Sequence, residues 1–132
     1  MASGTGSTFL KRVLIADAAA TGVTGLLMAL LPRTLADLLL VSAALLFWAG
    51  VILIPYAAGV AYLAMRDPIP RRAVAAVIAC NVLWAVDCLL LAFSGWIEPN
   101  VLGYTFIAVQ VAVVVAFAEL QWVGLRRTPA TV

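Results

Sequence analysis

The sequence predicts an all-α membrane protein in which four transmembrane helices form an antiparallel bundle. Of the 132 residues, 66% are hydrophobic and only 11% are charged, and the mean hydropathy is +1.16. Soluble domains are only about half apolar and carry about a quarter charged residues. The apolar residues also form long runs, close to the roughly 20 residues that a helix needs to cross a bilayer core. We therefore expect one domain that is embedded in lipid.

The first spanning helix is expected at about residues 8–31. Lys11 and Arg12 precede its apolar run, which contains Asp17. A cleaved signal peptide is the competing interpretation, but this run is longer than a usual signal core and carries an acid. Residues 1–7 are small and polar, and we expect a disordered tail there. One stripe of this helix is made of small residues that would let another backbone approach closely: Ala18, Gly22, Gly25 and Ala29.

A short interfacial helix is expected at about residues 35–41, because Thr34 and Asp37 have the spacing of a capping box. A single helix from Leu35 to Met65 would be about 46 Å long, which exceeds a hydrocarbon core of about 30 Å. The second spanning helix is therefore expected at about residues 43–65.

The third and fourth spanning helices are expected at about residues 70–94 and 99–125. Pro70 and Pro99 suit the first turn of each helix. Residues 128–132 form a short C-terminal tail in this interpretation. The transmembrane domain as a whole would cover residues 8–127.

The basic residues predict how the bundle is oriented. Arg33 lies alone on one side of the expected membrane, whereas the other seven of the eight basic residues lie on the opposite side. Cytoplasmic loops carry the excess of Lys and Arg. Both termini of this multi-pass protein should therefore be cytoplasmic. The seven residues are Lys11, Arg12, Arg66, Arg71, Arg72, Arg126 and Arg127.

Polar side chains inside the expected spans are the candidate intramembrane sites. At about 1.5 Å per residue from the flanking arginines, Asp17 and Glu119 share the inner third of the membrane. Asp87 and Gln110 share the outer third, and Asn81 lies near the middle. Asp17 with Glu119 could form a carboxyl pair or a weak cation site in the inner layer. In the outer layer, a protonated Asp87 would donate to Gln110 or to a backbone carbonyl.

The same side chains also have a purely structural interpretation, which we weigh equally. Polar groups hold membrane helices together by about 0.6 kcal/mol each on average, although intramembrane acids are functional candidates by default. Trp84, on the face of the third helix that carries Asp87, is better explained by core packing than by ligand contact. Gln110 and Glu119 are nine residues apart and point to opposite sides of the fourth helix. One of them should therefore face a neighbouring helix or another protomer.

Three hypotheses for function follow. The first is small-solute or proton-coupled transport through the polar layers, with Pro55 as a flexible point. The second is a non-catalytic structural or accessory membrane subunit whose polar residues lock helix or partner packing. The third is a lipid- or quinone-binding protein or an enzyme. It ranks last because the sequence has no His and its two cysteines, Cys80 and Cys88, form no paired redox motif.

No catalytic residue, cofactor or metal site is therefore predicted. The expected partners are membrane lipids and either a second copy of the chain or another membrane protein, and no nucleic acid. The segment Phe117–Arg127 (FAELQWVGLRR), together with Asn81–Trp84 (NVLW), resembles small uncharacterised bacterial inner-membrane proteins with four helices. This resemblance implies a bacterial host and the cytoplasmic membrane, and it brings no assigned activity.

Overall fold

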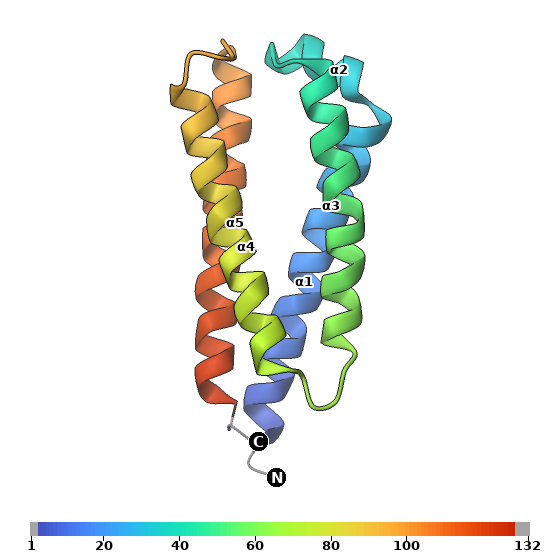
Figure 1. The fold of residues 1–132 in the computed structure, drawn as a ribbon, viewed down its shortest axis with the longest axis vertical. Helices are drawn as coiled ribbons and strands as arrows, with labels where there is room; N and C mark the ends of the chain where they lie inside the picture. Colours follow the sequence, from blue (N-terminus) through green and yellow to red (C-terminus); the bar gives the residue numbers. More distant parts are fainter. Residues whose placement is uncertain (1–2, 129–132) are drawn as a thin grey trace.

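The computed structural model describes residues 3–128, and the side chains of residues 8–128. In this range the chain forms five helices and no strand (Figure 1). Four of them are long and apolar enough to cross a membrane. The predicted class, a four-helix membrane bundle with a short extra helix after the first span, is confirmed. The helices are α1 (Ser3–Leu30), α2 (Pro32–Leu39), α3 (Ala43–Ala64), α4 (Arg71–Phe93) and α5 (Val101–Arg127).

The first two helices begin earlier than the sequence suggested. The first turns of α1, from Ser3 on, occupy most of the segment that was expected to be a tail. Helix α2 begins at Pro32 because a proline, which lacks an N–H, is favoured at the first position of a helix. Thr34 and Asp37 therefore lie inside α2, and the expected capping box is not formed.

The other helix starts have side-chain caps or a proline. The Ser42 hydroxyl accepts a hydrogen bond from the Leu45 N–H at 3.4 Å and caps α3. Helix α5 begins at Val101, about two residues later than expected. The Asn100 side chain accepts from the Gly103 N–H at 2.8 Å and makes Asn100 the N-cap. Pro70 occupies the N-cap position of α4.

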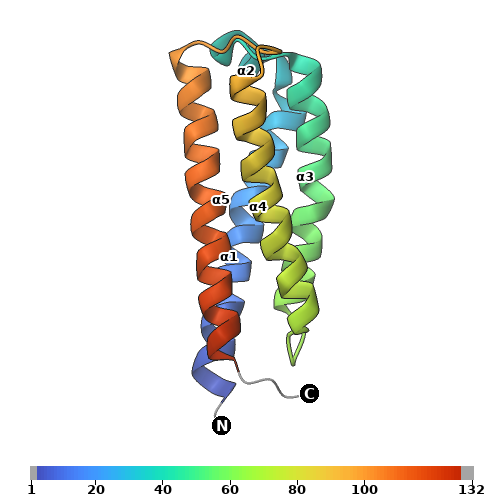
Figure 2. The ribbon, with the colours of Figure 1, turned by 60° about the vertical axis from the view of Figure 1, so that its left-hand side comes forward.

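The four spans form two packed pairs, α1 with α3 and α4 with α5. Figures 1 and 2 show the two pairs meeting at the end of the molecule that carries the termini and spreading apart toward the other end. The small-residue stripe of α1 does contact α3. A Cβ added at Gly50 of α3 would lie 2.7 Å from both the Ala29 nitrogen and the Gly25 oxygen, so these two backbones nearly touch.

Two clusters of apolar side chains join the pairs at different heights. The lower cluster, near the termini, is built around Leu14, Val60, Val74 and Leu125 and includes residues from all four spans. The upper cluster is built around Met28, Leu46 and Leu53 of the first pair, and Trp84 and Phe106 of the second pair pack against it. Between the clusters the two pairs are less closely packed, and α3 and α4 have little contact with each other.

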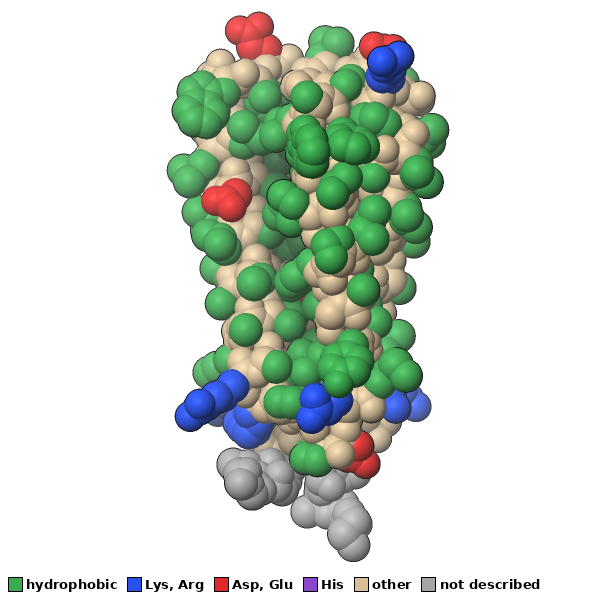
Figure 3. Space-filling view, turned by 45° about the vertical axis from the view of Figure 1, so that its right-hand side comes forward, with side chains coloured by type: hydrophobic (Ala, Val, Ile, Leu, Met, Phe, Trp, Pro, Cys, Tyr) green, Lys and Arg blue, Asp and Glu red, His purple; other side chains and the backbone are tan. Residues whose placement is uncertain are grey.

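Most charged side chains in this view lie at the two ends of the molecule, and the surface between them is mainly apolar, with one acidic side chain on it (Figure 3). Lys and Arg gather at the end that carries the termini. Arg71 links two helices at this end, because its Nη1 donates to the carbonyls of Leu125 at 2.9 Å and Thr128 at 2.7 Å. Arg71 therefore caps the last turn of α5 from the start of α4.

Candidate functional site

A buried carboxylate lies at the point where the two helix pairs meet. Asp17 of α1 is 0% exposed. Its Oδ1 accepts from the Thr21 hydroxyl at 2.9 Å, and its Oδ2 accepts from Asn81 Nδ2 at 3.0 Å and from Gln121 Nε2 at 2.6 Å. All three partners are neutral donors. The protein therefore stabilises this acid in the membrane with hydrogen bonds from three helices and not with a basic residue.

Asn81 of α4 connects this carboxylate to the rest of the bundle. Its Nδ2 also donates to Gln121 Oε1 at 3.0 Å, and its Oδ1 accepts from the Tyr56 hydroxyl of α3 at 3.3 Å. Turning the Asn81 amide over would place its oxygen against the Asp17 carboxylate. Among the described residues no buried side-chain N or O lacks a hydrogen-bond partner. We call Asp17, Asn81, Gln121 and Tyr56 the polar network; it fixes one arrangement of all four spans.

The possible inner pairing of Asp17 with Glu119 is not formed. Glu119 is exposed on the outer surface of α5, and Gln121 takes its place beside Asp17. The sequence did contain a signal for this. Gln121 follows Gln110 by eleven residues, which is three helical turns, so both amides lie on the inward face of α5. Glu119 lies about 200° away from Gln121 around the helix.

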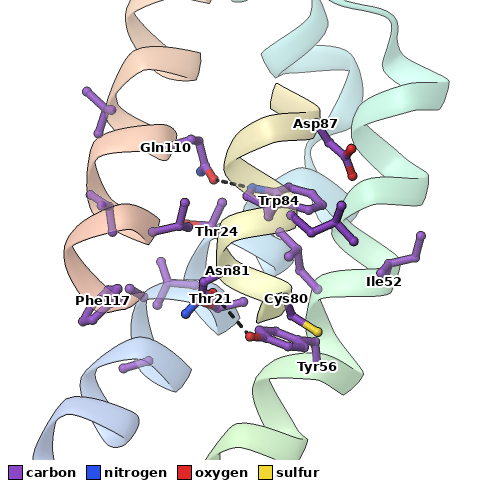
Figure 4. A pocket seen from close by; sticks show the side chains of 18 residues that line it. Thr21, Thr24, Ile52, Tyr56, Cys80, Asn81, Trp84, Asp87, Gln110 and Phe117 are labelled. Atoms are coloured by element: carbon purple, nitrogen blue, oxygen red, sulfur yellow. Dashed lines mark hydrogen bonds between the residues drawn. The ribbon is translucent and has the colours of Figure 1, made fainter. Parts of the chain in front are cut away.

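A cavity of about 700 Å³ lies directly beyond the polar network, in the half of the bundle away from the termini. All four spans line it, and most of the lining side chains are apolar. Tyr56 and Asn81 form the polar part of its floor (Figure 4). Its polar lining side chains are Thr21, Thr24, Tyr56, Asn81, Trp84, Asp87 and Gln110.

Trp84 and Gln110 bridge the second helix pair inside this cavity. Trp84 Nε1 donates to Gln110 Oε1 at 3.3 Å (Figure 4). The expected contact of Asp87 with Gln110 is therefore not made, although both residues line the same space. Asp87 is exposed, and its carboxylate lies on the side of α4 that faces α3.

The cavity is closed at both ends. At the lower end are the polar network and the lower cluster. At the upper end, Trp84 and Phe106 pack on the upper cluster, and Asn100 ties α5 to α2. Asn100 Nδ2 donates to the Leu38 carbonyl at 2.8 Å, and the Asn100 N–H donates to the Leu39 carbonyl at 3.3 Å.

The cavity is open at its sides. Ile52 of α3 and Leu83 of α4 line it and are 62% and 60% exposed. On the opposite side, Val23 of α1 and Val109 of α5 line it and are 59% and 55% exposed. Figure 3 shows the surface hollowed over apolar side chains between two columns of the molecule. In a bilayer these openings would face lipid chains.

Cys80 lines the cavity and Cys88 does not, and both are free thiols. In the described part of the chain, no three His, Cys, Asp or Glu side chains come together as a group that could hold a metal ion. Comparison of the chain with protein-family models, with curated proteins and with solved structures finds no match.

Proposed function

We propose that this integral membrane protein binds an apolar or amphipathic small molecule that enters the cavity sideways from the bilayer. The observation that carries the proposal is that the cavity is closed at both ends and open at its sides. A ligand from water would have to pass the polar network or the contact between α2 and Asn100. A ligand already dissolved in the lipid meets no such barrier between α3 and α4.

The size and chemistry of the cavity support this function. Ligand sites are typically about 300–1,000 Å³, mainly apolar, with a few polar groups that fix orientation. This cavity has about 700 Å³, apolar walls on all four spans and polar groups at its floor and at Asp87. The lipid-binding hypothesis, ranked last from the sequence, is therefore the one that the geometry favours.

Transport is the second candidate, and a different observation favours it. Asp17 lies between the cavity and the basic end of the molecule and has only neutral hydrogen-bond partners. If those bonds opened, the cavity would connect with that end. We rank transport after simple binding, because transport would require the four spans to separate at the polar network that joins them.

Photolabelling with a neutral lipid-like probe tests the proposed function. Protein in phospholipid nanodiscs is irradiated with a fatty alcohol that carries a diazirine, and the modified residues are mapped by mass spectrometry. We expect saturable labelling of cavity residues such as Trp84. Phe93, which is 84% exposed and outside the cavity, should be labelled in simple proportion to probe concentration.

A pair of tryptophan substitutions on α1 provides the control. Thr24→Trp places an indole in the cavity and should remove the saturable labelling, whereas Leu27→Trp lies on the exposed side of the same helix and should leave it unchanged. Uniform, unsaturable labelling of all lipid-facing residues in the wild-type protein would refute ligand binding in the cavity. Uptake of a solute by proteoliposomes, lost in Thr24→Trp, would instead support the transport candidate.

A further inference from the structure

Asp87 lines the cavity and has no hydrogen-bond partner among the other polar side chains that line it. Tyr56 donates to Asn81, and Trp84 donates to Gln110. Figure 4 draws both of these hydrogen bonds and none to Asp87. Asp87 lines the cavity about two turns below the upper end of α4, at roughly 9 Å from Phe93. A carboxyl group at such a depth in a membrane helix is unfavourable unless something pairs with it.

The cavity lining contains an acidic side chain and no basic one. Asp87 is the one carboxyl group among the lining residues, and no Lys or Arg lines the cavity. The basic residues lie at the end that carries the termini, except Arg33, which belongs to α2 at the opposite end. Among the described residues, no basic side chain therefore lies near Asp87 to neutralise its charge. The cavity is complementary to a positively charged ligand.

We propose that the ligand of this cavity is a lipophilic cation, with Asp87 as its counter-ion at the opening between α3 and α4. The inference rests on the proposed function and names the chemical class of its ligand. The apolar body of the cation would lie against Leu83, Ile52 and the cavity wall, and its charge would lie beside Asp87. Trp84, three residues before Asp87 on α4, also lines the cavity, and an indole near the bound charge would add a cation–π attraction.

Other chemical classes fit less well. A lipophilic anion would place its charge against the Asp87 carboxylate. A neutral ligand would fill the apolar space and leave Asp87 uncompensated. A hydrophilic cation has no route through the closed ends of the cavity and no affinity for the apolar walls. The combination of an apolar cavity with a single acid at its lateral opening selects a molecule that is both lipophilic and positive.

Two probes of the same shape and opposite charge test this inference. Binding of radiolabelled tetraphenylphosphonium and of tetraphenylborate to the wild-type protein is measured in nanodiscs of zwitterionic phosphatidylcholine, and binding to empty nanodiscs is subtracted. We expect saturable binding of the phosphonium cation and none of the borate anion. Equal binding of the two probes, or binding of the anion alone, would overturn the proposal without any substitution.

Two isosteric substitutions then test which acidic residue attracts the cation. Asp87→Asn should weaken phosphonium binding about tenfold or more, as expected for loss of a charge in contact with the ligand in a medium of low dielectric. Glu119→Gln removes the other exposed acid of the spans, which lies outside the cavity, and should have no effect. Equal losses in the two variants would indicate a general surface charge effect and would overturn the assignment of Asp87, as would unchanged affinity in Asp87→Asn.

The neutral diazirine probe separates this inference from the function on which it rests. Saturable labelling of the cavity by the neutral probe, without any preference for the phosphonium cation, would leave ligand binding standing and remove the cationic class. Failure of both the neutral probe and the cation would remove both. Asp87→Asn should keep its neutral labelling, which shows that its cavity is intact.

Discussion

At the residue scale, the Asp17 carboxylate determines which polar side chains can sit around it. It accepts three hydrogen bonds and gives none, so its neighbours must be donors. Two amides suit this position because each carries donors for the carboxylate and an oxygen for another partner. A second acid beside Asp17, such as Glu119, would instead add another hydrogen-bond acceptor to this buried site.

The first prediction tests the polar network. Gln121→Leu removes one donor from Asp17 and one acceptor from Asn81, and both of these groups remain buried. We expect a loss of about 1–3 kcal/mol in the free energy of unfolding, the usual cost of a buried polar group left without its partner. Unfolding by SDS in mixed micelles, followed by circular dichroism, measures it.

Gln110→Leu is the matched control for Gln121→Leu. It removes the other amide of the same face of α5, which is half-buried and makes one hydrogen bond, with Trp84. Its cost should be roughly 0.6 kcal/mol, the average for a polar contact between membrane helices. If Gln110→Leu cost as much as Gln121→Leu, the network would have no special role in stability.

At the element scale, the contact of α1 with α3 depends on glycine at one position. A Cβ at Gly50 would meet backbone atoms of Gly25 and Ala29 at 2.7 Å, and backbone cannot move aside as a flexible side chain can. Gly50→Ala should therefore push the two helices apart and cost about 1–3 kcal/mol, as for overpacked cores. The same SDS titration measures this loss.

Gly59→Ala, on the same helix, distinguishes steric overlap from a general effect of alanine. A Cβ at position 59 meets no atom within 4 Å. Because alanine favours helices over glycine, this change should be neutral or should stabilise by up to about 1 kcal/mol. Destabilisation of similar size in both variants would contradict the steric account of Gly50.

A further prediction concerns the contact between α2 and α5. Asn100→Ala removes the N-cap of α5 and the side-chain bond to Leu38, while the backbone bond to Leu39 remains. Loss of an N-cap costs about 1 kcal/mol, so amide hydrogen exchange should quicken in α2 and in the first turn of α5. Ser42→Ala, which removes the longer 3.4 Å cap of α3, should have a smaller effect. Unchanged exchange in α2 would show that Asn100 does not hold it.

The positions of the helices could be predicted from the sequence, but the contacts between helices were harder to predict. Hydropathy and length locate the four spans because each must satisfy its own backbone in lipid. The start of α2 could not be settled in this way, because Pro32 and the capping-box pattern at Thr34 favour different first residues. The stripe of Gly22 and Gly25 correctly indicated a close helix contact. Nothing in a linear pattern identified Gly50 as its partner.

At the scale of the whole molecule, the candidate site depends on how the two helix pairs lean against each other. Depth along a helix placed Asp17, Asn81 and Asp87 in the membrane, but depth does not say which side chains face one another. The two helix pairs are in close contact near the termini, and Asn81 therefore lies within hydrogen-bond distance of Asp17. Beyond that contact the pairs diverge, and Asp87 lies at the opening between them. The cavity arises from this divergence and has no sequence motif.

The orientation of the whole bundle is the last prediction. We propose that the end carrying the termini and most Lys and Arg residues faces the cytoplasm of a bacterium. In a background with Cys80→Ala and Cys88→Ala, Glu98→Cys lies in the loop before α5, and Thr128→Cys lies just after α5. A membrane-impermeant maleimide added to intact spheroplasts should label position 98 and should reach position 128 only after lysis. The reverse pattern would show that the basic end faces outward, and labelling of both positions in intact spheroplasts would show that the protein inserts in both orientations.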